Sequence, residues 1–171
     1  FIPSIKTLNK YKYSLPIKFC FFGDIKTNRE IHLCSDALKK LPKNLTYKFD
    51  IYGNVIDKNY LRRITDNDKN KKITYKGILN YHNASHILSK YDVAILTNQI
   101  DINSKYTIPG KFWEYLSCGL PIISNNRPSI KMYFKNYNIG WILKTPQEWN
   151  DCLMRIINGK EKLLEKKKKT L

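Results

Sequence analysis

The chain has 171 residues, the length of one domain, and 42% of them are hydrophobic, which is typical of a folded protein and excludes a disordered one. Lys and Arg number 31 against 14 Asp and Glu, and the formal net charge of +17 favours phosphate-bearing ligands, polyanions or anionic lipid surfaces as partners. No run approaches the about 20 consecutive apolar residues of a membrane span, and the opening FIPSIKTLNK lacks the apolar core of a signal peptide.

Six short runs of β-branched, aromatic or alternating residues predict strands, at residues 17–23, 47–53, 72–77, 92–98, 121–124 and 140–144. Helical spacing of apolar residues predicts a helix after each strand, at residues 31–41, 58–66, 82–91, about nine residues from Pro109, 130–137 and from Pro146 onward. Strands that alternate with helices form a parallel sheet with helices on both faces. The predicted fold class is therefore α/β, with a doubly wound, six-stranded parallel sheet.

The two ends of the chain differ from this pattern. The chain starts at Phe1 rather than Met, and residues 1–15 show little periodicity, so we expect them to be a lead-in or linker from an amino-terminal domain that this chain lacks. Residues 16–171 are expected to form the single domain. The closing EKKKKTL is the one true charge run, and we expect it to finish a solvated helix, with a membrane-surface contact as the alternative.

Cysteines and histidines give little sign of a metal or disulfide site. Four cysteines lie in apolar segments without paired spacing: Cys20, Cys34, Cys118 and Cys152. We expect buried, reduced thiols, because disulfide frameworks and zinc sites show clustered spacings. His82 and His86 are four residues apart, as metal ligands on a helix can be, but no third ligand lies near them, so we expect surface or packing histidines.

In a doubly wound sheet the strand order reverses between the first and fourth strands, and ligands bind in the crevice at their carboxyl ends. The loops at residues 23–29 and 98–109 follow those two strands. Gly23 leaves room for a ligand beside the backbone, and Arg29 can donate to phosphate oxygens. The alternatives are a plain turn at Gly23 and, favoured when Arg29 is taken alone, a solvated surface arginine. Neither GxGxxG nor GxxxxGK[ST] is present, which disfavours a dinucleotide enzyme and a P-loop protein.

The segment TIPGKFWEYLSCGLPIIS, which starts at Thr107, predicts an anion site. Its helix follows a Pro-Gly turn, so free N–H groups and the positive end of the helix dipole face the crevice, and Lys111 adds a charge in the first turn. Glu114 lies on the same stripe as Lys111, and its carboxylate can accept two hydrogen bonds from a vicinal diol such as a ribose. Phe112 and Leu116 are expected to pack into the core. An exposed Lys111–Glu114 salt bridge is the alternative.

These residues resemble a known family. The pattern P-x-K-x-x-E-Y-x-x-x-G-x-P-[IV]-[IV] resembles the donor-site motif of GT-B glycosyltransferases of group 1 (family 4), in the branch with P-x-K-x-x-E-Y. FFGDIKTNREIHLCSDALKKLP, FDIYG and ITYKGILNYHNASHILSKYDVAILT are similar to earlier segments of that family, so the resemblance covers about residues 17 to 144 in order and spacing.

The resemblance implies the Rossmann-like, carboxyl-terminal half of a GT-B fold, which binds a nucleotide sugar. In the family, the residue matching Glu114 holds the ribose, the glycine matching Gly23 lies against the diphosphate, and a basic residue at Arg29 pairs with phosphate. Gly77 matches the glycine whose loop reads the base, and Thr107 and Lys111 complete the candidate nucleotide-sugar site.

Two positions depart from the family pattern. Asp24 stands where many members carry an arginine, which weakens phosphate binding unless Lys111 or Lys26 substitutes for it. Tyr106 stands where many members carry a second glutamate, which leaves the sugar contacts and the stereochemistry open, although the P-x-K-x-x-E-Y branch also lacks that glutamate.

The expected function is that of a hexosyltransferase-like enzyme domain, which binds a UDP- or GDP-linked sugar for transfer to a glycan or glycolipid, as in surface polysaccharide biosynthesis. We expect no metal, no cofactor and no nucleic acid, and an amino-terminal acceptor domain of the same or another chain as partner. The chain alone is expected to bind nucleotide weakly and to turn over nothing. Its expected place is the cytoplasm, with peripheral contact to an anionic inner membrane face.

Two other function classes stay open. One is a basic module that binds nucleic acid or an anionic surface through its positive charge. The other is a non-catalytic partner subunit of a two-chain transferase.

Overall fold

The computed structural model describes residues 15–66, 68, 71–159, 163 and 166. In this part of the chain the strands form one six-stranded sheet in the order β3-β2-β1-β4-β5-β6, and the pairs are all parallel. The strands are β1 (Ile17–Phe22), β2 (Tyr47–Tyr52), β3 (Ile73–Tyr75), β4 (Val93–Leu96), β5 (Ile122–Asn125) and β6 (Gly140–Leu143). The predicted doubly wound, Rossmann-like sheet is confirmed, with its order reversing between β1 and β4.

Each strand is followed by a helix, as predicted. The α-helices are α2 (His32–Lys40), α3 (Lys58–Thr65), α4 (Tyr81–Leu88), α5 (Gly110–Ser117), α6 (Lys131–Tyr137) and α7 (Pro146–Ile157). Asp57, Asn80 and Thr145 cap α3, α4 and α7 by accepting hydrogen bonds from first-turn N–H groups, which fixes where these helices begin. Three 3₁₀ helices were not predicted: η1 (Thr27–Arg29), η2 (Ile102–Lys105) and η3 (Pro128–Ile130).

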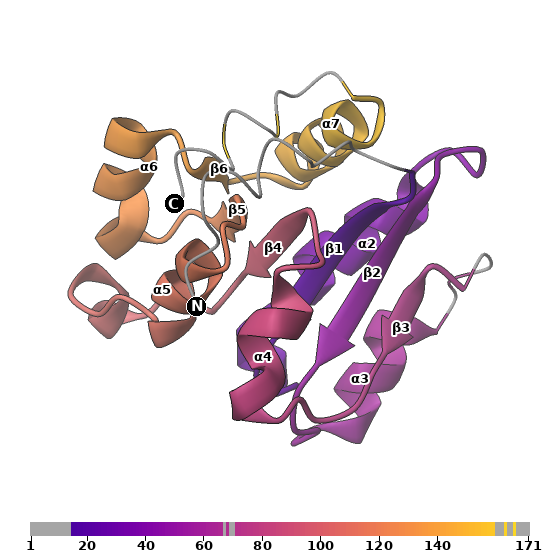
Figure 1. Ribbon diagram of the computed structural model, residues 1–171, viewed down its shortest axis with the longest axis horizontal. Coiled ribbons are helices and arrows are strands. Elements are labelled where there is room, and N and C mark those ends of the chain that lie inside the picture. Colours follow the sequence, from indigo (N-terminus) through magenta and orange to yellow (C-terminus); the bar gives the residue numbers. More distant parts are fainter. Residues whose placement is uncertain (1–14, 67, 69–70, 160–162, 164–165, 167–171) are drawn as a thin grey trace.

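The sheet separates two hydrophobic cores, and helices cover both faces (Figure 1). Phe19 points to the face covered by α2, α3 and α7, where Trp149 of α7 is buried. The next residue, Cys20, points to the face covered by α4, α5 and α6. This alternation follows from the two-residue repeat of a strand. Strand β4 reads as a continuous apolar run because both of its faces are buried. Strand β5 is also fully buried, but it ends in the polar residues Ser124 and Asn125.

Hydrogen bonds join the turns after β1, β2 and β3 along one edge. The Gly23 N–H donates to the Tyr52 carbonyl at 2.9 Å, and the Gly53 N–H donates to the Gly77 carbonyl at 3.0 Å. The turns approach so closely that a Cβ atom on Gly53 would lie 1.7 Å from the Gly23 carbonyl oxygen. The carboxyl edge of the sheet therefore carries Gly23, Gly53 and Gly77 on three successive turns.

The remaining sequence predictions concern the chain ends, the cysteines, two histidines and membrane-spanning helices. Residues 1–14, most of the expected lead-in, and most of the closing EKKKKTL lie outside the described residues. The four cysteines are free and buried, and His82 and His86 are exposed. Within the described ranges, none of the helices combines the length and the apolar character needed to cross a bilayer.

Candidate functional site

Helix α5 begins at the carboxyl edge of the sheet, next to the end of β1. Its N-cap is Pro109, whose extended backbone and missing side-chain acceptor leave the first-turn N–H groups without a side-chain cap. These groups and the helix dipole favour negative charge at this point. The predicted anion-binding end of the helix therefore lies at the predicted crevice.

The buried face of α5 differs in one residue from the prediction. Phe112 is fully buried, as expected, but Leu116 is only half-buried, and Tyr115 takes the second core position. The Tyr115 hydroxyl accepts a hydrogen bond of 2.8 Å from the Phe22 N–H at the end of β1. Burial raises the pKa of Tyr115 well above its ordinary value, so the hydroxyl stays protonated. Helical spacing in the sequence identified the two stripes of α5. It could not reveal the hydrogen bond of Tyr115, because Phe22 lies on a strand that is distant in the chain.

Lys111 lies against Gly23. A Cβ atom on Gly23 would come within 2.5 Å of the Lys111 Cε, so a larger residue here would displace the end of this side chain. The Lys111 Nζ lies 4.6 Å from the centre of the Phe22 ring, in cation–π contact. Among the described residues Lys111 forms no ion pair with Glu114, so the exposed salt bridge is not what the structure contains. The ammonium group is therefore free to meet an anion at the end of β1.

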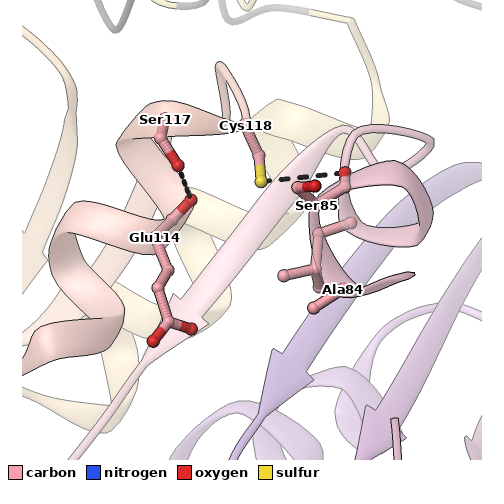
Figure 2. A pocket seen from close by; sticks show the side chains of 6 residues that line it. Ala84, Ser85, Glu114, Ser117 and Cys118 are labelled. Atoms are coloured by element: carbon pink, nitrogen blue, oxygen red, sulfur yellow. Dashed lines mark hydrogen bonds between the residues drawn. The ribbon is translucent and has the colours of Figure 1, made fainter. Parts of the chain in front are cut away.

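Glu114 lines a cavity of about 140 Å³ between α4 and α5. Figure 2 shows its carboxylate pointing away from Ser117 and Cys118, while the backbone carbonyl of Glu114 accepts the Ser117 hydroxyl at 2.8 Å. Cys118, at the end of the same helix, also lines the cavity, and its thiol lies 3.8 Å from the Ser85 carbonyl of α4. Within the described part of the chain the Glu114 carboxylate has no ion-pair partner. Its oxygens are thus available to hydroxyl donors.

Arg29 joins the loops that follow β1 and β4. Its Nη1 donates to the Asn98 Oδ1 at 3.0 Å, and its Nη2 lies 3.7 Å from the Asp24 Oδ2. The Gln99 N–H also donates to the Asn28 carbonyl, at 2.7 Å. The residue that departs from the family pattern, Asp24, therefore partly neutralises Arg29. The Nε of Arg29 is buried without a hydrogen-bond partner among the described residues.

Thr107 is held by an arginine that sequence reasoning missed. Arg127 donates to the Thr107 carbonyl from Nε at 3.3 Å and from Nη2 at 3.1 Å, and to the Thr107 hydroxyl at 3.0 Å. The Ser129 hydroxyl donates to the same carbonyl at 2.9 Å. Arg127 is 5% exposed, and burial lowers the pKa of its guanidinium, opposed by the Asp101 carboxylate. In the sequence, only its position just after the fifth predicted strand indicated that Arg127 could lie near the site.

Gly77 follows β3 and lies apart from Lys111 and Glu114 in the chain. Its carbonyl accepts the Gly53 N–H, which joins the turn of Gly77 to the turn of Gly53, next to that of Gly23. Its φ of +88° is a left-handed conformation that favours glycine. The next residue, Ile78, is 74% exposed. The turn thus offers backbone groups and one apolar side chain at the carboxyl edge.

The structure brings Lys111 against Gly23, with Glu114 one turn further along α5, and places Arg29 in the adjoining loop. Gly77 lies two turns along the same edge, and Thr107 lies at the entrance to α5. The described residues contain no group of three or more His, Cys, Asp or Glu side chains arranged to hold a metal ion.

A protein-family model and several solved structures match this chain. A model of the family described as Glycosyl transferases group 1 matches residues 9–170. No curated protein sequence matches the chain significantly.

Solved structures match at low identity. WaaG, a glycosyltransferase involved in lipopolysaccharide biosynthesis, superposes with a TM-score of 0.71 at 13% identity, over 90% of this chain and 41% of WaaG. Anabaena Alr3699/HepE, solved in complex with UDP, gives 0.74 at 12% identity, over 90% of this chain and 42% of that protein. The carboxyl-terminal domain of the group 1 protein LpcC from Francisella tularensis gives 0.69 at 13% identity, over 90% of this chain and 80% of that one.

The chain therefore spans less than half the length of WaaG and HepE, and its sheet corresponds to the carboxyl-terminal domain of their GT-B fold. Because the family model covers nearly all of the sequence, the chain belongs to the group 1 glycosyl transferases.

Proposed function

We propose that residues 16–171 form the donor-binding domain of a glycosyltransferase, which binds a nucleotide-diphosphate sugar for transfer to a glycan or glycolipid. The observation that carries the proposal is the contact of Lys111 with Gly23, at the end of β1 and beside the first turn of α5. A cation, a bare backbone turn and a helix N-terminus then converge where a doubly wound sheet binds its ligand.

The diphosphate is the first part of the proposed ligand. Lys111 supplies the main cation because it has no carboxylate partner among the described residues, whereas Arg29 already shares Asp24. Negative charge grows on the diphosphate as the glycosidic bond breaks, and fixed cations and helix N–H groups stabilise that charge. No residue of the described domain is assigned as a general base.

The nucleoside is the second part. Glu114 lines the cavity of about 140 Å³, and its carboxylate has two oxygens for the two ribose hydroxyls. The turn of Gly77, on the same edge, offers backbone groups for the base. Thr107, held by Arg127, sets the start of α5 and thereby the position of the sugar.

The structural neighbours guide the choice of donor and acceptor. HepE has been solved with UDP and with UDP-glucose, and WaaG acts in lipopolysaccharide biosynthesis. We therefore propose a UDP-linked donor ahead of a GDP-linked one, and an acceptor from surface polysaccharide assembly. The GtfA/B complex contains two chains, which supports an acceptor domain on the same or on another chain.

Calorimetric titration of UDP and GDP into the full-length protein tests this proposal. Lys111→Met and Glu114→Gln should each weaken binding about tenfold or more, since a lost charge-assisted hydrogen bond costs about 1.5–3 kcal/mol. Lys135→Met, at an exposed position of α6, is the matched control and should bind as the wild type does.

Melting temperatures of the same variants separate lost contacts from lost folding. Both site variants should melt within a few degrees of the wild type, because their side chains are partly exposed. Unchanged nucleotide affinity in both would remove them from the site. Binding of an oligonucleotide, with no heat from either nucleotide, would favour the basic nucleic-acid module instead.

A further inference from the structure

A second cavity lies on the face of the sheet next to α4, towards the amino-terminal ends of β1 and β2. Its volume is about 400 Å³, and its lining includes Lys18 of β1, Lys48 of β2 and Lys90 from the turn after α4. Lys18 and Lys48 are the second residues of their strands, whereas the candidate nucleotide site lies beyond the last residues. The lysines of this cavity and the proposed nucleotide site therefore lie at opposite ends of the same strands, although the cavity wall extends along β2 to Tyr52.

The register of the sheet places Lys18 and Lys48 side by side. They are partners in the parallel pairing of β1 with β2, so both side chains project from the same face. Neighbouring strands lie about 4.8 Å apart, and like charges that face each other across two strands destabilise a sheet. Lys90 adds a third positive charge from a separate element.

The three ammonium groups are not neutralised within the described residues. None of them forms an ion pair or a side-chain hydrogen bond there. Asp50 lines the cavity too, but its carboxylate accepts the Tyr91 hydroxyl at 2.8 Å and lies 4.0 Å from the Lys76 Nζ. Nearby, the Asp92 carboxylate accepts the backbone N–H of Lys18 at 2.8 Å. The cavity therefore keeps a net positive charge.

Two hydrogen-bonded tyrosines, Tyr52 and Tyr91, form one wall of the cavity. The hydroxyls of Tyr52 and Tyr91 lie 2.8 Å apart, and their rings meet edge to face at 6.2 Å. Tyr91 donates its proton to Asp50, so Tyr52 donates to Tyr91. Burial, reinforced by these hydrogen bonds, raises the pKa of Tyr91, which keeps the wall uncharged at neutral pH. Such a network holds the cavity open in one shape.

We propose that this cavity binds a phosphate group, held between the ammonium groups of Lys18, Lys48 and Lys90. A phosphate carries about −1.5 to −2 charges on a compact set of acceptor oxygens, and lysine is a point-charge donor for it. The cavity is larger than the ion, so the phosphate belongs to a larger molecule, either a soluble phosphate ester or an anionic lipid headgroup. The site is independent of the proposed nucleotide site.

Calorimetric titration of inorganic pyrophosphate into the full-length protein tests the cavity. The background carries Arg29→Gln and Lys111→Met, which weakens the other expected phosphate site. Adding Lys18→Gln and Lys48→Gln should lower pyrophosphate affinity at least about tenfold, as the loss of two charged contacts requires. The control pair Lys131→Gln and Lys135→Gln removes the same charge from α6, at the far end of the sheet, and should change affinity less than about twofold.

Melting temperatures show whether the lysine variants still fold. Because Lys48→Gln relieves the repulsion from Lys18, this variant should melt no lower than the wild type. The proposal is overturned if the background protein binds no pyrophosphate, if the Lys18/Lys48 pair leaves binding unchanged, or if the control pair weakens it equally.

Sedimentation with lipid vesicles distinguishes the two sources of phosphate. Vesicles that contain phosphatidylglycerol should bind the wild type but not the Lys18/Lys48 variant if the ligand is a headgroup, and phosphatidylcholine vesicles should bind neither. Pyrophosphate binding that depends on these lysines, without vesicle binding, assigns the cavity to a soluble phosphate ester.

Discussion

The Tyr115 hydroxyl and the Phe22 N–H form a hydrogen bond of 2.8 Å between residues 93 positions apart in the chain. It joins the middle of α5 to the last residue of β1, one residue before Gly23. The position of Lys111 against Gly23 therefore depends on a contact made one turn further along the helix. Tyr115 does not line the candidate site, but its hydrogen bond fixes the distance between α5 and the end of β1.

Tyr115→Phe removes this hydrogen bond with little change in volume. The Phe22 N–H then loses its partner, so we expect the free energy of unfolding to fall by about 1–2 kcal/mol. Nucleotide affinity should fall several-fold, because α5 is no longer fixed to β1. Urea unfolding and calorimetry measure the two effects. Tyr137→Phe, at an exposed position of α6, should change neither, and a Tyr115 variant as stable as the wild type would contradict the tether.

Gly53→Ala tests the close approach of the turns after β1 and β2. The new Cβ would lie 1.7 Å from the Gly23 carbonyl oxygen, and backbone must move to admit it. We expect a loss of roughly 3 kcal/mol or more in the free energy of unfolding. Gly110→Ala is the control: its Cβ meets nothing within 4 Å and lies in a helix, so stability should stay the same or rise slightly.

We expect the free energy of unfolding to fall in mild acid because of His32. Burial, and then the charge of Arg63, lowers the pKa of His32 below its ordinary 6.5, although Asp36 and Glu30 oppose this shift. Between the lowered pKa and 6.5 the unfolded chain binds more protons than the folded protein, so the free energy of unfolding rises with pH through that window and falls as pH drops through it.

The neutral imidazole has a structural role that its protonated form loses. The Nδ1 of His32 lies 3.0 Å from the Tyr60 hydroxyl, which already accepts the His32 N–H. The hydroxyl proton is thus directed at Nδ1, and a protonated ring cannot accept it. His32→Asn keeps an acceptor there without a titrating group. Its urea midpoints at about pH 7 and about pH 5.5 should lie closer together than those of the wild type; an unchanged difference would contradict the assignment.

Arg127→Lys should loosen the segment that leads into α5. Lysine keeps the charge but cannot reproduce the three hydrogen bonds that Arg127 makes to Thr107. We expect trypsin to cleave after the exposed Lys105 several-fold faster under native conditions, because cleavage follows the local opening of a loop. Arg62→Lys, at an exposed position of α3, should leave the rate unchanged. An equal rate in both variants would mean that Arg127 does not hold this segment.

Local sequence patterns predicted the elements of the fold well. The strand run from Ile17 and the helix start at Pro146 match the structure, because apolar runs and proline act over a few residues. The order of strands followed from their alternation with helices, since crossovers of this kind place each strand beside a small set of neighbours. The position of Lys111 and Glu114 at the carboxyl edge followed in turn.

Contacts between distant segments were not predictable in the same way. Helical spacing could not decide between Tyr115 and Leu116 as the second core residue of α5, because the answer depends on a backbone N–H at the end of β1. Arg127 looked like one more surface cation in a basic chain. Its burial depends on Thr107, which lies 20 positions earlier and becomes its neighbour only when η2 and η3 meet.

The division of the hydrophobic interior by the sheet has a consequence for how such a protein can change over time. Lys111, Glu114 and Tyr115 all belong to the layer of α4, α5 and α6, while the larger cluster lies under α2, α3 and α7. Substitutions that remodel the layer carrying the proposed donor site leave the packing of the opposite layer in place. New specificities can therefore accumulate on one side while the other preserves the architecture.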